Sequence, residues 1–226
     1  NWDSPIPISP HDSDRLSFAS QRLWRSEDRG DNWNAISEDL TTNTNRYELP
    51  YMGRVWELDA LHDNGAMSKY STVTSITESS VQEDLLYTGS DDGLIHFPSD
   101  AGQTWTRAGV FPGVPERAFI NDVNTVFAAA DAHKIGNYTP YLFRSDDNGQ
   151  NWTNITGDLP DETIVWAVQQ DHVDPNLLVI AAEWGIYFSP NGGTNWHKLA
   201  GSPTIAFRDV KLHRRDNDII GATFGR

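Results

Sequence analysis

The chain has 226 residues, no cysteine and a formal net charge of −15, from 32 acidic and 17 basic side chains. The absence of cysteine excludes disulfide scaffolds, thiol nucleophiles and Cys-based metal sites. The acidic balance argues against a nucleic-acid partner, which requires clustered Lys and Arg. No stretch approaches the ~20 consecutive apolar residues of a membrane span. Nine tryptophans within an aromatic share of 11% predict an ordered core.

A turn motif of the form Ser-x-Asp-x-Gly-x-x-Trp recurs along the chain. All four copies keep the glycine and the tryptophan, whereas Pro98 replaces the leading serine of the second copy and Asn191 replaces the aspartate of the fourth. The copies, called boxes below, are 26–33, 98–105, 145–152 and 189–196, so successive tryptophans are 72, 47 and 44 residues apart. A capping Asx side chain, a glycine turn and a ring packed between strands explain the motif without catalysis.

Short apolar, β-branched and aromatic segments bounded by turn residues precede each box, which is the pattern of β-strands. We predict first strands near 5–8, 73–76, 165–168 and 207–210. We predict second strands near 14–18, 84–87, 124–127, 176–179 and 218–220. Glycine turns often follow, at 91–93, 183–185 and 223–225, and the box then leads into a short fourth strand such as 105–107 or 152–154. No segment has a sustained helical period with caps.

Four strands that recur every ~40–50 residues are typical of a β-propeller blade. We therefore predict an all-β fold, a β-propeller of four-stranded antiparallel blades with box turns. The expected blades are 1–37, 70–109, 117–157, 162–200 and a partial unit at 204–226, with 38–69 as an insertion loop. About four and a half blades predict part of a larger, seven-bladed ring, whose remaining blades would lie on a longer parent chain.

The boxes resemble the Asp boxes of bacterial-neuraminidase-type (BNR) repeats, which occur in sialidases, xyloglucanases, sortilins and photosystem II assembly factors. Other stretches resemble large bacterial sortilin-type BNR-repeat proteins that are often labelled glycosyl hydrolases: 66–70, 112–117, 171–176 and 222–226. The resemblance covers nearly the whole chain. It implies that the boxes lie on outer turns, away from the ligand face, and that the protein is extracellular, periplasmic or otherwise attached to the bacterial cell envelope.

Two functions fit this resemblance. The first is a secreted or envelope-associated, sortilin-like propeller that binds a protein or carbohydrate ligand on one face without catalysis. The second is a sialidase- or xyloglucanase-like glycoside hydrolase, which needs two carboxylates at a defined separation. The 32 acidic residues include no assignable acid–base pair, so we favour the binding function and keep the hydrolase as the alternative. No cofactor is expected.

Candidate ligand-binding residues lie at the starts of first strands and at glycine turns, where side chains could reach the funnel of a propeller. They comprise three arginines, the number that a sialidase uses for its substrate carboxylate, and several aromatic residues: Arg54, Arg117, Arg208, Trp56, Trp166, Trp184 and Phe207. Packing between blades is the competing explanation for the rings, and ion pairing or solvation for the arginines. Trp184 is the ring that we expect to be exposed.

Carboxylates at loop positions are the candidate catalytic residues. They are Glu116, Glu183 and Asp91, with Asp92 and Glu162 equally well placed. A metal site is not predicted. An EF-type calcium loop starting at Asp146 would need a glutamate where Gly157 stands, and the seven histidines show neither HxH nor HExxH spacing.

Overall fold

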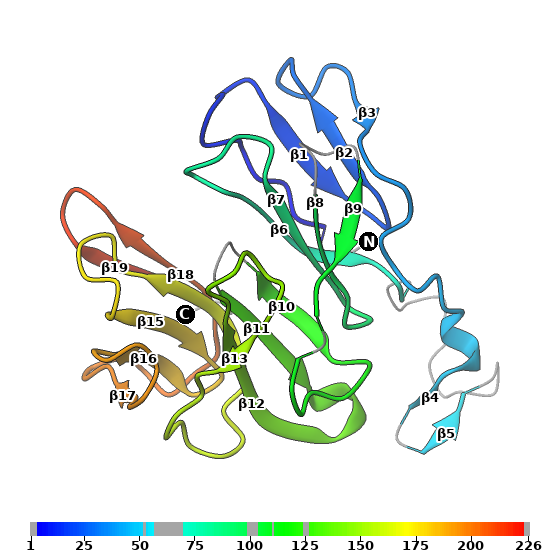
Figure 1. The fold of residues 1–226 in the computed structure, drawn as a ribbon. Coiled ribbons are helices and arrows are strands. Elements are labelled where there is room, and N and C mark those ends of the chain that lie inside the picture. Colours follow the sequence, from blue (N-terminus) through cyan, green and yellow to red (C-terminus); the bar gives the residue numbers. More distant parts are fainter. Residues whose placement is uncertain are drawn as a thin grey trace.

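The computed structural model describes residues 4–51, 53–56, 70–98, 104–109, 111–123 and 127–223. Most of the second box, much of the insertion, and parts of the predicted second strand at 124–127 and of the predicted turn at 223–225 lie outside these residues. The described strands form antiparallel sheets that lie side by side in chain order, as Figure 1 shows. The fold is all-β, and its sheets are the blades of a β-propeller.

Three sheets contain four strands each, in the order of the chain. Blade 2 consists of β6 (Val73–Glu78), β7 (Leu86–Ser90), β8 (Ile95–Pro98) and β9 (Trp105–Arg107). Blade 3 consists of β10 (Phe119–Val123), β11 (Phe127–Ala132), β12 (Asn137–Arg144) and β13 (Thr153–Asn154). Blade 4 consists of β14 (Val165–Gln170), β15 (Leu178–Ala182), β16 (Gly185–Ser189) and β17 (His197–Lys198).

The sheets at the two ends of the series differ from these three. Blade 1 contains β1 (Leu16–Ala19), β2 (Leu23–Ser26) and β3 (Asn34–Ala35), and residues 5–9 run beside β1 through backbone hydrogen bonds of 3.0 to 3.3 Å. Blade 5 contains β18 (Phe207–His213) and β19 (Asp218–Thr223). Among the described residues, no strand pairs with the outer edge of β19. The described sheets therefore form an open arc.

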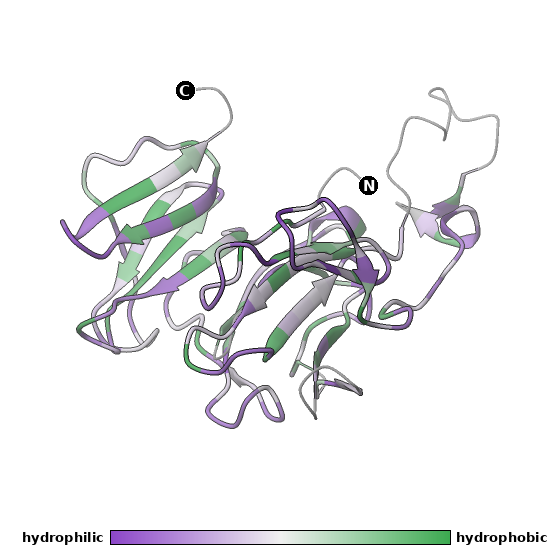
Figure 2. Cartoon of the chain, turned by 90° about the horizontal axis from the view of Figure 1, so that it is seen from above, coloured by the Kyte–Doolittle hydropathy of each residue, from purple (hydrophilic) through white to green (hydrophobic). Residues whose placement is uncertain are grey.

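The predicted insertion loop contains regular structure. It holds the 3-10 turn η1 (Arg46–Glu48) and a hairpin of β4 (Pro50–Tyr51) and β5 (Arg54–Val55). Figures 1 and 2 show this hairpin standing away from the blades. At its start the insertion is tied to blade 2, because the backbone N–H and the hydroxyl of Thr42 both donate to Asp92 at 2.7 Å.

Apolar strand residues form the contacts between successive blades. In the hydropathy colouring of Figure 2 the strands carry apolar bands between polar ones, and many turns are polar. Every residue of β7, β11 and β15 is buried, because the blades on both sides cover the middle of each sheet. Gly89 on β7 lies against Ile120 of blade 3, and a Cβ at this position would collide with the isoleucine side chain. Glycine thus permits the close approach of these two blades.

A bulge interrupts the two innermost strands of blades 2 to 5 at the same position. The bulged residues are Thr74, Asn121, Trp166 and Arg208. Two of them bond to the next blade, since Thr74 donates to the carbonyl of Ile120 at 2.9 Å and Asn121 donates to that of Val165 at 2.8 Å. A β-bulge re-aims side chains, and here it directs them across the boundary between blades.

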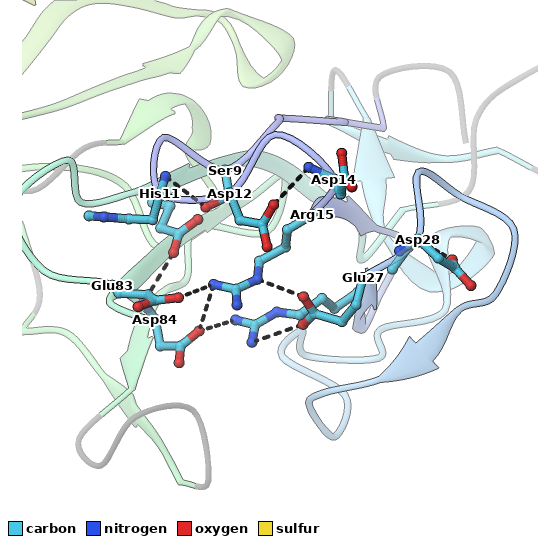
Figure 3. Close-up of polar contacts among 12 residues, drawn as sticks. Ser9, His11, Asp12, Asp14, Arg15, Glu27, Asp28, Glu83 and Asp84 are labelled. Carbon is cyan, nitrogen blue, oxygen red and sulfur yellow. Dashed lines mark hydrogen bonds and ion pairs between the residues drawn. The ribbon is translucent and has the colours of Figure 1, made fainter.

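Blades 1 and 2 are also joined by ion pairs, drawn in Figure 3. Arg15 of blade 1 contacts Glu27 at 2.8 Å and Glu83 at 2.7 Å, and Arg25 contacts Asp84 at 2.7 Å. Glu83 and Asp84 belong to the turn between β6 and β7 of blade 2. The Arg15 side chain is only 13% exposed, so its contacts are partly shielded from solvent.

The three boxes that the structure describes share one hydrogen-bond network. In the third box, Ser145 Oγ accepts from the N–H of Gly149 at 2.8 Å and donates to Asp147 at 2.9 Å. Asp147 also accepts from the backbone and side-chain nitrogens of Asn151, at 2.8 and 2.6 Å, and these bonds lower the pKa of its carboxyl. The first box repeats the network, and so does the fourth with Asn191 in place of the aspartate, except that the Asn191 amide donates to Asn195 Oδ1 at 3.0 Å.

Two of the four box tryptophans bond to the preceding blade, whereas Trp152 is buried beside Phe111 and its N–H has no hydrogen-bond partner among the described residues. Trp196 donates to the carbonyl of Ile155, and Trp105 to that of Ile36, both at 3.2 Å. Trp33 differs: its ring is 37% exposed, and its N–H bonds to Gly30 of its own turn at 2.9 Å. The prediction that box rings are buried is thus wrong for Trp33, because no described blade covers its face.

Candidate functional site

Two edges of each blade can be distinguished by their turns. The boxes follow the third strand of each blade. The opposite edge carries the starts of the first strands and the turns between the second and third strands, since adjacent strands are antiparallel. Most of the predicted site residues lie at this second edge. We call the group formed there by blades 3 to 5 the rim cluster: Asp131, His133, Trp166, Glu183 and Arg208.

Trp166, at the start of β14, is the centre of the rim cluster. The guanidinium carbon of Arg208 lies 3.4 Å from its ring centroid, and the His133 ring meets it edge-on at 5.9 Å. Its indole N–H donates to Glu183 Oε2 at 3.0 Å. Trp166 is 9% exposed. The Trp166 ring therefore positions the Arg208 guanidinium and the Glu183 carboxylate. Little of the ring surface remains accessible for a ligand to stack on.

Asp131 and His133 lie at the end of β11. The buried Asp131 carboxylate accepts from His133 Nδ1 and, at 3.2 Å, from the His133 backbone N–H. These contacts fix the imidazole ring against Trp166. Among the described residues, His133 Nε2 has no hydrogen-bond partner, so it is available to a ligand. Two carboxylates, a guanidinium group and an imidazole ring thus lie close together at this rim.

Trp184 presents a fixed aromatic surface beside the rim cluster. It follows Glu183 in the turn between β15 and β16, and it is 45% exposed, as the sequence predicts. Its N–H donates to the backbone carbonyl of Glu162 at 3.1 Å. Glu162 has a φ of +61°, a left-handed conformation that is uncommon for residues other than glycine. Backbone strain of this kind concentrates at functional sites.

Asp91 and Asp92 are buried in the turn after β7 and hold the structure together. Asp91 accepts from the backbone N–H and the hydroxyl of Thr72, at 2.8 and 2.9 Å. Burial raises the pKa of Asp91 to about 6, although the bonds from Thr72 oppose this rise. Asp92 accepts from Thr42 and Ser90. Both predicted candidates thus have structural partners, and neither contacts Glu183.

The three predicted arginines share no contact among the described residues. Arg54 belongs to the insertion hairpin and stacks on the exposed Trp56 at 4.8 Å. Arg117 and Glu116 are exposed and line a pocket between blades 2 and 3. The structure brings only Arg208 into the rim cluster, together with Trp166 and Glu183. Phe207 is buried in the core between blades 4 and 5, where packing is its role.

Sequence reasoning missed Asp131 and His133, and also Lys134, which lies 4.3 Å over the Phe119 ring. A signal was present, because His133 to Ile135 precede Gly136 just as Asp91 and Asp92 precede Gly93. This turn is therefore the blade 3 counterpart of the glycine turns that the sequence identified. The described residues include no group of three or more His, Asp or Glu side chains that could hold a metal ion.

The first box is the part of the chain that a family model identifies: the BNR-Asp box repeat matches residues 23–36. The chain carries BNR-Asp box repeats on a β-propeller fold. No curated protein matches its sequence. Within the described residues, no helix has the length and apolarity needed to cross a membrane.

Several solved structures are similar to this BNR propeller. The GH74 xyloglucanase from Xanthomonas campestris has 18% identity and a TM-score of 0.59 over 87% of this chain and 29% of its own. The extracellular domain of BT4673 from B. thetaiotaomicron has 11% identity and a TM-score of 0.60, and the match covers 93% of this chain and 25% of that one. YCF48 from Cyanidioschyzon merolae has 13% identity and a TM-score of 0.53, and the match covers 99% of this chain and 65% of that one. At these identities the likeness shows the fold alone, and the chain spans less than a third of the xyloglucanase.

Proposed function

We propose that this chain is part of a secreted or envelope-associated, sortilin-like bacterial propeller that binds a protein or glycan ligand at its rim face without catalysis. Further blades on a longer parent chain would extend the arc. One observation carries the proposal: Trp184 is an exposed ring whose orientation is fixed by its bond to Glu162. A ring held in place before binding loses little conformational entropy when a ligand stacks on it.

The rim cluster supplies the polar groups that such a ligand would need. Glu183 and the free Nε2 of a neutral His133 can accept, whereas Arg208 can donate, and all three side chains are positioned by Trp166. An exposed aromatic ring next to a few oriented polar groups is the usual composition of a ligand site. Exposed tryptophans and arginines also contribute most of the free energy at protein interfaces. The same surface therefore suits a sugar ring or a protein side chain.

A glycan array and a pull-down with the intact parent protein test this proposal. Trp184→Ala is expected to weaken binding at least tenfold, which is about the decrease in affinity caused by removing one stacking side chain. Tyr47→Ala is the matched control, because Tyr47 is an exposed ring of the insertion, away from the rim cluster. Unchanged binding by Trp184→Ala, or no ligand in either assay, would contradict the proposal.

The alternative function, a glycoside hydrolase, is favoured by one observation. Burial raises the pKa of Asp91 to about 6, which is within the range of a general acid. The bonds from Thr72 to both oxygens of Asp91, and that from Trp166 to Glu183, give these carboxylates structural roles instead. Turnover of xyloglucan or aryl glycosides, abolished by Asp91→Asn, Glu116→Gln or Glu183→Gln, would establish the hydrolase. Absence of turnover over a broad substrate panel would exclude it.

A further inference from the structure

A second concave site lies between the insertion and blades 2 and 3. It is a pocket of about 420 Å³ that shares no lining residue with the rim cluster. Its apolar lining includes the half-buried Leu49 and Val114 and, behind them, the buried Leu94, Ala108 and Phe111. Cavities of about 300–1,000 Å³ with an apolar lining and few polar groups are typical of small-molecule sites.

Two arginines line this pocket without partners. Neither Arg107 nor Arg117 forms an ion pair, a ring contact or a side-chain hydrogen bond with another described residue, and both are exposed. This is unusual in a chain with 32 acidic and 17 basic residues. The Arg107 charge also acts on its cross-strand neighbour His96, whose pKa falls to about 4, mainly through burial and further through Arg107. Two guanidinium groups that form no ion pair among the described residues thus lie beside an apolar surface.

Neither acidic residue of the lining forms an ion pair with these arginines among the described residues. Asp92 is buried and accepts from Thr42 on one oxygen and from Ser90 on the other, so both of its oxygens are engaged by donors of the protein. Glu116 is exposed and forms no ion pair with another described residue. The bonds between Thr42 and Asp92 also hold one wall of the pocket in place.

We propose that this pocket binds a small ligand that combines an apolar body with an anionic group, such as an aryl carboxylate. The apolar body lies against the half-buried Leu49 and Val114, and the anion is paired with Arg107 and Arg117. Charge-assisted hydrogen bonds from guanidinium groups to carboxylates are among the strongest in proteins. This site is separate from the rim face, so neither proposal depends on the other.

Isothermal titration calorimetry with a matched pair of probes tests the proposal. Naphthalene-2-carboxylate has the proposed composition, and naphthalene-2-carboxamide lacks only the charge. We expect one carboxylate to bind per chain, about tenfold more tightly than the carboxamide, which corresponds to one charge-assisted contact. Inorganic phosphate, an anion without an apolar body, is expected to bind more weakly than the carboxylate.

Variants identify the site. Arg107→Gln and Arg117→Gln are each expected to weaken carboxylate binding about tenfold and to leave carboxamide binding unchanged. Glu116→Gln should tighten carboxylate binding, because it removes a like charge. Arg214→Gln is the control, since Arg214 is an exposed arginine between β18 and β19, and Trp184→Ala should also leave carboxylate binding unchanged. Equal affinity for the two probes, wild-type affinity in both pocket variants, or no saturation at millimolar concentrations would overturn the proposal.

Discussion

The guanidinium carbon of Arg208 lies 3.4 Å from the ring centroid of Trp166, and the two residues occupy the same bulge position in neighbouring blades. The bulge residues of blades 2 and 3 reach the next blade through hydrogen bonds, whereas this pair does so through a cation–π contact. The contact therefore positions part of the rim cluster and also fastens blade 5 to blade 4.

Replacing this cation should destabilise the contact between blades 4 and 5. Arg208→Met keeps much of the side-chain volume but removes the charge, and we expect a loss of about 1–2 kcal/mol in the free energy of unfolding. Urea denaturation measures it. Arg215→Met is the control, because Arg215 pairs only with its exposed neighbour Asp216. A loss that is equal in the two variants would contradict a specific role for the cation–π contact.

The ion pairs between blades 1 and 2 should contribute measurably to stability. Arg15→Met removes contacts to Glu27 and Glu83, and we expect a loss of about 2 kcal/mol, in the range of hydrogen bonds to charged groups. Salt should reduce this loss because it screens charges. Arg29→Met, which removes an exposed pair with Asp14, should change stability by less than Arg15→Met does. Similar losses from Arg15→Met and Arg29→Met would show that the partial burial of Arg15 has no energetic effect.

Asp91 predicts a particular dependence of stability on pH. Its pKa is about 6 in the folded chain and about 3.9 when unfolded, so the folded state binds the proton more tightly. Its contribution is therefore present at low pH and is lost as the pH rises from about 4 to 6. Asp91→Asn cannot ionise, and its stability relative to wild type should increase by about 2–3 kcal/mol between pH 4 and 7.

Asp158 provides a control of opposite sign for this measurement. Bonds from the Asn195 side chain and the Trp196 backbone lower the pKa of its carboxyl, so its stabilising contribution is present at neutral pH and lost on acidification. Asp158→Asn should therefore lose stability relative to wild type as the pH rises from 3 to 7. Parallel trends for Asp91→Asn and Asp158→Asn would contradict the assigned directions of the two pKa shifts.

The boxes predict that asparagine can replace aspartate in the turn. Asn191 Oδ1 accepts from Ser189 and the Asn195 backbone N–H as Asp147 does from Ser145 and Asn151, and its side-chain amide donates to Asn195 where Asp147 accepts. Asp147→Asn should therefore lower the thermal midpoint at pH 7 by less than Asp147→Ala, which leaves Ser145 and Asn151 without an acceptor. Differential scanning calorimetry measures both variants. A decrease of equal size in the two variants would show that the Asx side chain is not the stabilising element.

Features that depend on local sequence were predicted successfully. A box contains all the residues of its own hydrogen-bond network, so its repetition indicates a repeated turn, and the strands around it follow from short apolar segments. Trp184 stands between Glu183 and Gly185 in a turn, and its exposure follows from that position.

Features that depend on contacts between blades were not predicted. The alternation of residues in a strand does not reveal a bulge, so nothing indicated that Trp166 and Arg208 would be equivalent and in contact. Asp131 and His133 were missed for the same reason, because Asp131 fixes the His133 ring against Trp166, which belongs to the next blade. The exposure of Trp33 likewise depends on which blades surround it and not on its own turn.

The hydrogen bonds of Trp105 and Trp196 have a consequence for synthesis on the ribosome. Each indole bonds to a carbonyl that belongs to the blade made before it. When Trp196 leaves the exit tunnel, the segment that carries Ile155 has already emerged. The turns that carry Trp105 and Trp196 can therefore close onto a blade that has already been made, without waiting for a later segment.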